Sequence, residues 1–277
     1  MDYKWVYSLW TEPSGDIRTK ALNWVSPKAH LYSWVLSVMK AKEFTEELEL
    51  VTDDLGVEIL INDLELPFTS VKNILNGYSE YKDFWAFGKI KAYEIQDKPF
   101  IHMDADAFLW NGIPDKIKNK EVFAQNIEDK EWFKDAYKSQ INHLESKNSF
   151  NKTDSWGEVE YAYCTGLFGG TDIDFINKYA KEAISFLDRN KEVFKDIDNK
   201  GCYCVIFEQY LLACAAKKEN KNVYCLEKDL NKDNLALHRY THIWGEKKNK
   251  DIEKILGDIV KRDYPKQYKI IANYGRS

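Results

Sequence analysis

Apolar positions along this chain follow two spacings, one typical of buried strands and one typical of amphipathic helices. The first apolar segment, residues 4–10, is rich in aromatic and β-branched side chains, which predicts a strand. Residues 11–15, Thr-Glu-Pro-Ser-Gly, predict a loop after it. The next apolar side chains recur at helical spacing and predict an amphipathic helix: Leu31, Trp34, Val35, Val38 and Met39.

The same two patterns alternate along the rest of the chain. Strands are predicted at 47–52, 70–75, 100–103, 121–125, 161–168 and 223–226. Helices are predicted at 59–64, 84–93, 173–187, 205–216 and 251–260. Alternating strands and helices predict an α/β fold with a mainly parallel central sheet flanked by helices. In such sheets ligands bind beyond the carboxyl ends of the strands.

Length and composition favour a single globular domain. The chain has 277 residues, 44% hydrophobic and 31% charged, and it shows no low-complexity linker. We therefore expect one domain over 1–277, with a core over about 1–217 and a C-terminal part over about 218–277. The net charge of −5 argues against a general nucleic-acid binder, which would show a basic face.

Targeting signals and metal-binding cysteines are not evident. The N-terminus lacks a basic-then-apolar signal pattern, and no apolar run approaches the roughly 20 residues of a membrane span, so we expect a cytoplasmic protein without a transmembrane segment. The five cysteines are an odd number, and the Cys202-Tyr-Cys204 pair has no second pair to complete a zinc site. We expect reduced, structural thiols.

The first chemical motif is a pair of acids at the end of the predicted strand 100–103. Asp104-Ala-Asp106 lies inside the apolar segment 100–110, and two acids at i and i+2 in a tight turn can both face one point. Carboxylate oxygens suit a hard divalent cation, Mn²⁺ or Mg²⁺, that is shared with phosphate oxygens. The alternative is a solvated turn, since two acids in this spacing are common, but the apolar flanks favour a buried site.

The second motif is His242-Ile-Trp-Gly245-Glu-Lys-Lys248. The imidazole of His242 is a candidate third metal ligand. Gly245 would permit close backbone approach, and Lys248 would neutralise phosphate charge. A lone histidine is more often structural, but the H-x-x-G-x-x-K spacing is more specific than the histidine alone.

The order of these motifs resembles the family-8 retaining glycosyltransferases, which include the glycogenins and the bacterial lipopolysaccharide galactosyltransferases. That resemblance implies a GT-A-type nucleotide-sugar-binding fold. It also implies manganese at Asp104, Asp106 and His242, and donor diphosphate at Asp104, Gly245 and Lys248. The opening segment and residues 100–110 also resemble a poorly characterised group of bacterial glycosyltransferase-like proteins, which does not identify the substrate.

Further positions carry the same resemblance. Lys89 corresponds to a basic residue on a helix that touches the donor. Residues 164–170 resemble the family's Asn-Ala-Gly strand, and Glu208-Gln209-Tyr210 resembles its Asp-Gln-Asp helix start. Departures occur where the family has Asn, a third acid and Pro-Trp, because this chain has Cys164, Tyr210 and Asn249-Lys250 there.

The remaining candidates lie at predicted strand ends. Trp10 and Thr11 end the first strand, where this fold places the base of the nucleotide. The alternative for Trp10 is an aromatic side chain at the rim with no functional role. Asp53 could hydrogen-bond the nucleotide or cap the following helix. Glu208 and Gln209 are the candidates for the lower face of the sugar, since no stronger nucleophile is evident.

The sequence thus predicts a metal-dependent glycosyltransferase with a nucleotide-sugar donor, UDP-linked by preference and GDP-linked next, and an unidentified acceptor. Retention of anomeric configuration is implied by the resemblance alone. A nucleotidyltransferase and a non-catalytic binding or scaffold protein remain as alternatives, although the N-terminus has no Gly-rich phosphate loop.

Overall fold

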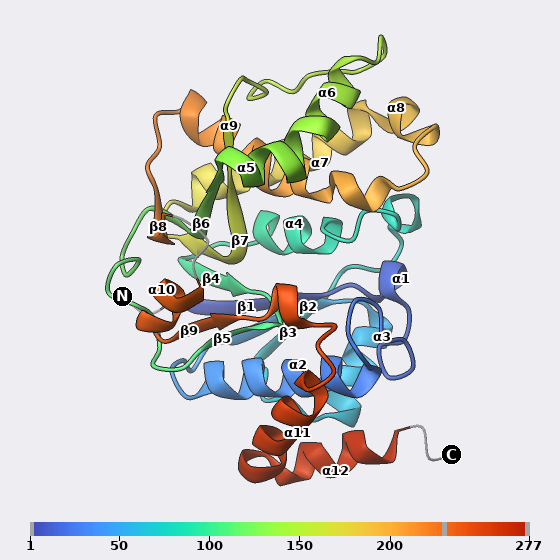
Figure 1. Cartoon of the computed structure of the whole chain (residues 1–277), viewed down its shortest axis with the longest axis vertical. Helices are drawn as coiled ribbons and strands as arrows, with labels where there is room; N and C mark the ends of the chain where they lie inside the picture. Colours follow the sequence, from blue (N-terminus) through green and yellow to red (C-terminus); the bar gives the residue numbers. More distant parts are fainter. Residues whose placement is uncertain (1–2, 229–231, 275–277) are drawn as a thin grey trace.

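A seven-stranded sheet forms the centre of the computed structural model, which describes residues 3–228 and 232–274 (Figure 1). The strand order is β3-β2-β1-β4-β7-β6-β8, and β7 runs antiparallel to its neighbours β4 and β6, whereas the other adjacent pairs are parallel. The strands are β1 (Lys4–Leu9), β2 (Leu48–Thr52), β3 (Ser70–Asn73), β4 (Phe100–Met103), β6 (Val122–Asp129), β7 (Tyr161–Gly170) and β8 (Val223–Glu227). The predicted α/β fold with a mainly parallel sheet is therefore confirmed.

Helices cover both faces of this sheet, and two apolar cores result. One face carries α2 (Pro27–Lys42), α11 (Ile252–Asp263) and α12 (Pro265–Asn273), and the other carries α4 (Phe87–Glu94), α7 (Ile173–Arg189) and α9 (Leu211–Lys218) (Figure 1). In β1, Trp5 and Tyr7 face the first core while Val6 faces the second. A strand buried on both faces reads as a continuous apolar run, which is why residues 4–10 predicted a strand so clearly.

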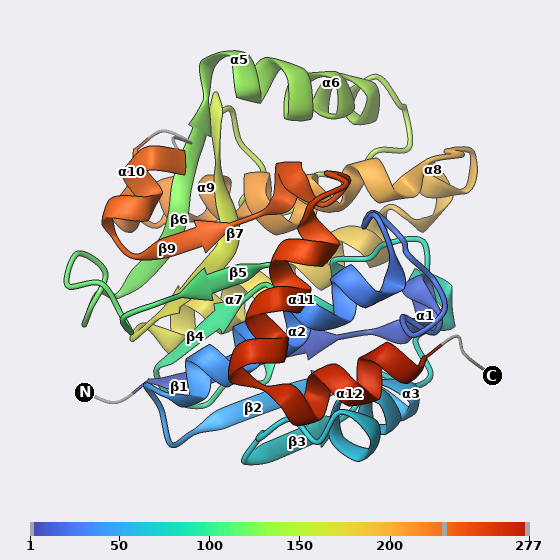
Figure 2. The ribbon, with the colours of Figure 1, turned by 60° about the horizontal axis from the view of Figure 1, so that its bottom comes forward.

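A small second sheet lies beside the main one and was not predicted. It pairs β5 (Ala107–Leu109) with β9 (Tyr240–His242) in antiparallel register, so that Ala107 is opposite His242 (Figure 2). Three-residue strands are too short to show a periodicity in sequence.

An outer helical layer over residues 130–145 was also missed. It contains α5 (Lys130–Phe133), a π-helical turn η3 (Lys134–Lys138) and α6 (Ser139–Glu145) (Figure 2). Its buried side chains fall three or four residues apart, a helical spacing that was present in the sequence: Phe133, Tyr137, Ile141 and Leu144. The many charged residues between them concealed it.

Several predicted boundaries were wrong. Residues 11–15 are not a loop, because Thr11–Ser14 forms a short helix, α1, which ends at Gly15 with φ of 67°. The predicted helix 205–216 is interrupted, since η5 (Ile206–Tyr210) is a π-helical turn that precedes α9. The predicted helix 59–64 is a π-helical turn, η1 (Glu58–Asp63), after the short α3 (Asp54–Val57). A second C-terminal helix, α12, begins at Pro265, where proline fits the first helical position.

Among the described residues, no helix has both the length and the apolar character needed to cross a bilayer. All five cysteines are free thiols.

Candidate metal and active site

The turn that carries the two acids is held by a strand and a helix. Asp104 directly follows β4, and its backbone N–H donates to the Gly166 carbonyl of β7 at 3.0 Å. The Ala107 N–H donates back to the Asp104 carbonyl at 3.0 Å, which closes the turn. From α2, the Ser33 hydroxyl donates to the Ala105 carbonyl at 2.7 Å. The backbone of the turn is therefore fixed before any ligand binds.

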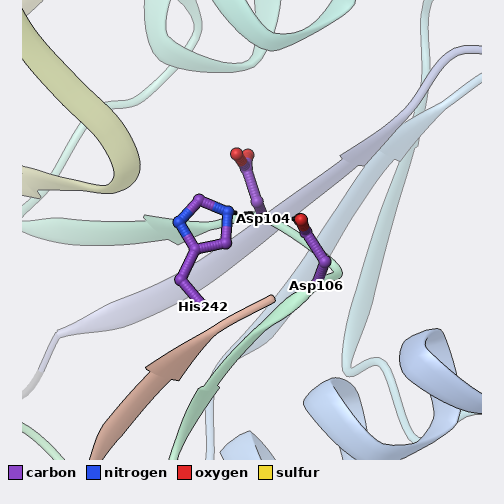
Figure 3. Close-up of side chains that lie close together, drawn as sticks. All are labelled: Asp104, Asp106 and His242. Atoms are coloured by element: carbon purple, nitrogen blue, oxygen red, sulfur yellow. Dashed lines mark ion pairs between the residues drawn. The ribbon is translucent and has the colours of Figure 1, made fainter. Parts of the chain in front are cut away.

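The small sheet brings His242 to this turn. Because β9 pairs with β5, the Ile243 N–H donates to the Asp106 carbonyl at 3.1 Å, and His242 Nε2 lies 3.2 Å from Asp106 Oδ2. One ligand atom from each of Asp104, Asp106 and His242 lies within 4.8 Å of the others (Figure 3). Two neighbouring acids and a histidine that is far from them in sequence thus form one cluster beyond the carboxyl end of β4.

The chemistry of this cluster fits a divalent cation. Two carboxylates are the ligands that Mg²⁺ and Mn²⁺ prefer, and one imidazole favours the transition metal of the two. Asp106 is 5% exposed, and no hydrogen bond of good geometry from the described residues reaches its Oδ2, although Lys247 Nζ lies 2.7 Å from that oxygen. A buried carboxylate oxygen needs a facing cation, which this ammonium supplies here and which a metal ion would supply in its place.

Asp104 belongs to a buried ionic network. Lys89 Nζ, from α4, lies 2.8 Å from Asp104 Oδ1 and 2.7 Å from Glu208 Oε1. The Thr165 hydroxyl also donates to Glu208. Burial alone would lower the pKa of Lys89, but the carboxylates of Asp104 and Glu208 raise it well above its usual value. Lys89 is therefore a buried cation next to Asp104 in the candidate metal site.

Asp106 meets a different lysine, Lys247, which the sequence analysis did not select. Lys247 Nζ lies 2.7 Å from Asp106 Oδ2 and 5.5 Å from the centre of the Trp24 ring. The Lys247 carbonyl accepts from the Val25 N–H at 2.8 Å. Burial would raise the pKa of Asp106, but Lys247 and His242 together hold that pKa well below its usual value.

A β-bulge in β7 aims side chains into this site. Ala124 of β6 pairs with Phe168, and Asn126 pairs with Cys164, so residues 165–167 lie opposite the single residue Gln125. Bulges of this kind re-aim side chains and are frequent near active sites. Here the bulge directs Thr165 to Glu208 and the Gly166 carbonyl to the acid turn.

Gly166 and Gln125 complete the surroundings of His242, and neither was among the predicted site residues. A Cβ atom at Gly166 would lie 2.5 Å from His242 Cε1 and 2.6 Å from Gln125 Oε1. Only glycine leaves room for the imidazole to pack there. Gln125 Oε1 lies 2.7 Å from His242 Nδ1. A glutamine inside a predicted strand carries no signal that would mark it as functional.

The residues predicted at the ends of β1 and β2 bind one another. Asp53 Oδ2 accepts from the Thr11 N–H at 2.7 Å and from its hydroxyl at 2.8 Å, while Oδ1 accepts from the Gly56 N–H at 3.0 Å. Asp53 therefore caps α3, which was one of its two predicted roles. Trp10 is buried against Phe87, with ring centroids 5.2 Å apart.

The other predicted residues differ in accessibility. Glu208 is fully buried, whereas Gln209 is half-buried and accepts a hydrogen bond from the Tyr137 hydroxyl. Both lie in the π-helical turn η5, a form of helix that is frequent at functional sites. Gly245 and Lys248 are exposed, in and just after the 3₁₀ turn η6 (Trp244–Glu246).

The fold thus brings together Asp104, Asp106, His242, Lys89 and Glu208 through direct contacts. Trp10, Thr11 and Asp53 lie in or next to the ends of neighbouring strands, and no hydrogen bond or ion pair among the described residues joins them to this cluster. Lys248 has no hydrogen bond or ion pair with any described residue of the cluster.

Comparison with known proteins gives one family and several distant folds. The sequence matches, over residues 3–274, the family described as "Family of unknown function (DUF6734)". No curated protein matches it.

Three solved structures illustrate the distant similarities. The apo form of mouse xyloside xylosyltransferase 1 is 12% identical with a TM-score of 0.39, and 82% of this chain and 85% of that chain are covered. An active-site mutant of LgtC is 12% identical with a TM-score of 0.38, over 72% and 68% of the two chains. The inositol-1-phosphate CTP transferase of T. maritima is 16% identical with a TM-score of 0.40, over 94% and 97%. Similarities this distant do not distinguish a xylosyltransferase from a CTP transferase.

Proposed function

Because this chain belongs to the DUF6734 family, a family of unknown function, its own site must indicate the reaction, and we propose that it is a metal-dependent glycosyltransferase. It would move a sugar from a nucleotide-sugar donor to an acceptor. The observation that carries this proposal is the convergence of Asp104, Asp106 and His242 within ligand distance at the carboxyl end of β4. The H-x-x-G-x-x-K spacing around His242 supports it by resemblance to the family-8 enzymes.

The metal site would serve the leaving group. Asp104, Asp106 and His242 would hold Mn²⁺, or Mg²⁺ in its place, and the cation would stabilise the departing diphosphate as a Lewis acid. One domain would contain the whole site, and residues 218–277 would complete it because β9 carries His242.

Lys89 and Lys248 would supply further positive charge to the site at two different places. Lys89 is buried and keeps positive charge beneath Asp104, where negative charge develops during transfer. Lys248 is exposed on the turn after Gly245, so it is free to meet a phosphate oxygen as a point cation, while the Gly245 backbone approaches the diphosphate. Removing one charge-assisted hydrogen bond of this kind costs about 1.5–3 kcal/mol, so Lys248→Ala should weaken UDP binding roughly ten- to a hundredfold.

The base and the sugar would occupy the two sides of the metal. We place the base near Trp10, Thr11 and Asp53, because these residues lie at the carboxyl edge of β1 and β2. Gln209 would contact the sugar, since its side chain is half-buried, whereas the enclosed Glu208 would act through Lys89. A UDP-linked donor, retention of configuration and a cytoplasmic location remain predictions from the sequence.

A donor-hydrolysis screen tests the proposal. UDP-, GDP- and TDP-sugars are incubated with the protein and Mn²⁺, and release of the nucleoside diphosphate is measured. We expect turnover of a UDP-sugar that excess chelator abolishes, that added Mn²⁺ restores and that Asp106→Asn removes. Full turnover in excess chelator would contradict a metal-dependent transfer.

Two further measurements separate the alternatives. Calorimetry should detect UDP binding only when Mn²⁺ is present, and equal binding without the metal would exclude a shared metal-diphosphate site. Formation of a nucleotide sugar from a nucleoside triphosphate and a sugar phosphate would identify a nucleotidyltransferase instead. Metal-dependent UDP binding without turnover of any donor would identify a binding protein.

A further inference from the structure

We infer that Asn126 and Gln125 fix which ring nitrogen of His242 carries its proton, and that they thereby present Nε2 as the metal ligand. This inference rests on the proposed function only in making His242 a ligand. The observation behind it is a chain of hydrogen bonds that begins at a backbone carbonyl and ends at the imidazole.

The backbone carbonyl orients the first amide. Asn126 Nδ2 donates to the Ile127 carbonyl at 3.0 Å. A carbonyl oxygen can only accept, so the nitrogen of the Asn126 amide must face it. The Asn126 oxygen therefore points the other way, where it accepts from Gln125 Nε2 at 2.9 Å.

The first amide orients the second. Since Gln125 must present its nitrogen to Asn126, its Oε1 faces the opposite side and has two neighbours, the Tyr240 hydroxyl and His242 Nδ1, both at 2.7 Å. This oxygen can only accept as well. His242 Nδ1 must therefore carry a hydrogen.

The second ring nitrogen, Nε2, then faces Asp106 in the candidate metal site. A neutral imidazole with its hydrogen on Nδ1 has a lone pair on Nε2, and Nε2 lies 3.2 Å from Asp106 Oδ2. A lone pair and a carboxylate oxygen at that distance repel each other, a repulsion that Lys247, 2.7 Å from the same oxygen, reduces and that a metal ion between the two atoms would remove. The hydrogen-bond chain thus keeps His242 in the form that a metal ion requires.

Packing keeps the chain rigid. Gln125 and Asn126 are fully buried, and the backbone of Gly166 lies directly against both His242 and Gln125. Neither amide can rotate without leaving a buried polar group unpaired, which is unfavourable. Gln125 and Asn126 are therefore positioning residues, which act on the metal through His242.

Nitrogen-15 NMR of histidine-labelled protein without metal tests the inference directly. The chain has five histidines, and His242→Gln identifies the signals of this ring. We expect the parent to show a hydrogen on Nδ1 and none on Nε2 under conditions where the ring is neutral. A parent spectrum with the hydrogen on Nε2 would overturn the inference.

Matched variants extend the test to metal affinity. Gln125→Met keeps the length of the side chain but removes the acceptor, so we expect a mixture of the two ring forms and a ten- to hundredfold weaker Mn²⁺ affinity. Gln125→Glu loses the donor to Asn126 but keeps an acceptor toward Nδ1, so it should keep the hydrogen on Nδ1 and bind Mn²⁺ more tightly than Gln125→Met does. Tyr240→Phe removes only the other donor to Gln125 and should match the parent.

The outcomes separate this inference from the proposed function. If Gln125→Met keeps the parent's ring form and Mn²⁺ affinity, or if Gln125→Glu loses both while it stays folded, the inference is wrong. If the parent binds no Mn²⁺ although Nδ1 carries the hydrogen, the inference about the ring survives and the proposed metal site fails.

Discussion

Asp104 and Asp106 are separated by one residue, yet they belong to two different halves of the site. The Asp104 half is built by the core of the chain, where Lys89 bridges Asp104 to the buried Glu208. The Asp106 half is built by the C-terminal segment, where His242 and Lys247 both face Asp106. Each acid has a lysine within 2.8 Å, but the side chain of Lys89 is 7% exposed and that of Lys247 is 25% exposed.

This difference separates a fixed charge from a movable one. Lys89 is held between two carboxylates in the interior, so it cannot leave without stranding Glu208. Lys247 has one carboxylate partner among the described residues, and its long side chain reaches solvent. The core half therefore sets the electrostatics of the site, and the C-terminal half is the part that can respond to a ligand.

The largest loss of stability should come from removing Lys89, which belongs to the Asp104 half of the site. Lys89→Met leaves the carboxylate of Glu208 buried without its cation, which should lower the free energy of unfolding by about 3–5 kcal/mol. Lys247→Met removes a cation that is 25% exposed and leaves His242 beside Asp106, so it should cost less than Lys89→Met. Urea unfolding measures both variants.

A second substitution distinguishes stranded charge from lost packing. Lys89→Met combined with Glu208→Leu removes both members of the buried pair and should recover part of the stability that Lys89→Met loses. Equal losses for Lys89→Met and Lys247→Met would remove the proposed difference between the two halves.

Acid should weaken both halves, because each contains a buried histidine. Burial, and then Lys247, lowers the pKa of His30 to about 3, and burial, and then Lys89, lowers the pKa of His102 well below 6.5. The unfolded chain binds protons below pH 6.5 that the folded chain does not, so stability present above pH 6.5 falls as the pH decreases toward 3. One histidine contributes at most about 1.4 kcal/mol per pH unit.

His30→Phe isolates the contribution of His30, which lies on α2 and is influenced by Lys247 and Asp106. It keeps an aromatic ring against Trp24, on which His30 stacks with centroids 5.3 Å apart. The free energy of unfolding, measured from pH 6.5 down to pH 4.5, should fall less steeply in this variant than in the parent. Parallel curves for the two proteins would show that His30 is not held neutral.

A methyl group at Gly166 should disturb the packing of His242 against Gln125 and the acid turn. Gly166→Ala places Cβ 2.5 Å from His242 Cε1, an overlap that should cost about 1–3 kcal/mol and weaken Mn²⁺ binding. Gly157→Ala is the control, because its nearest neighbour would be the Ser155 carbonyl oxygen at 3.6 Å. Thermal unfolding and Mn²⁺ titration should change for Gly166→Ala alone, and unchanged Mn²⁺ affinity there would mean that His242 is not a ligand.

The smallest expected effect tests whether Lys247 is movable. Its ammonium contacts Asp106 Oδ2 and would compete with a metal ion for that oxygen. Lys247→Ala should therefore bind Mn²⁺ several-fold more tightly, by on the order of 1 kcal/mol. Lys248→Ala is the matched control and should keep the Mn²⁺ affinity of the parent in the absence of nucleotide. Weaker Mn²⁺ binding by Lys247→Ala would indicate that Lys247 organises Asp106 and does not compete for it.

The sequence predicted the acids and the histidine but not what orients them. Asp104 and Asp106 end a clear apolar strand, and His242 has a specific spacing to a glycine and a lysine. Gln125 could not be found, because its role depends on a bulge in the neighbouring strand, which is a property of pairing and not of local pattern. Lys247 was missed beside Lys248 because which of two adjacent lysines faces inward depends on the turn after β9.

The bulge in β7 has a consequence for protein engineering. Grafting residues 100–110 and 240–248 onto another α/β protein would transfer the three candidate ligands and their turn. It would leave behind Gln125 on β6 and the widened stretch of β7, which orient the imidazole and anchor the acid turn. The smallest portable unit therefore comprises β4, β5, β6, β7 and β9 together, and a designer would have to reproduce the bulge in β7 as well as the candidate ligands.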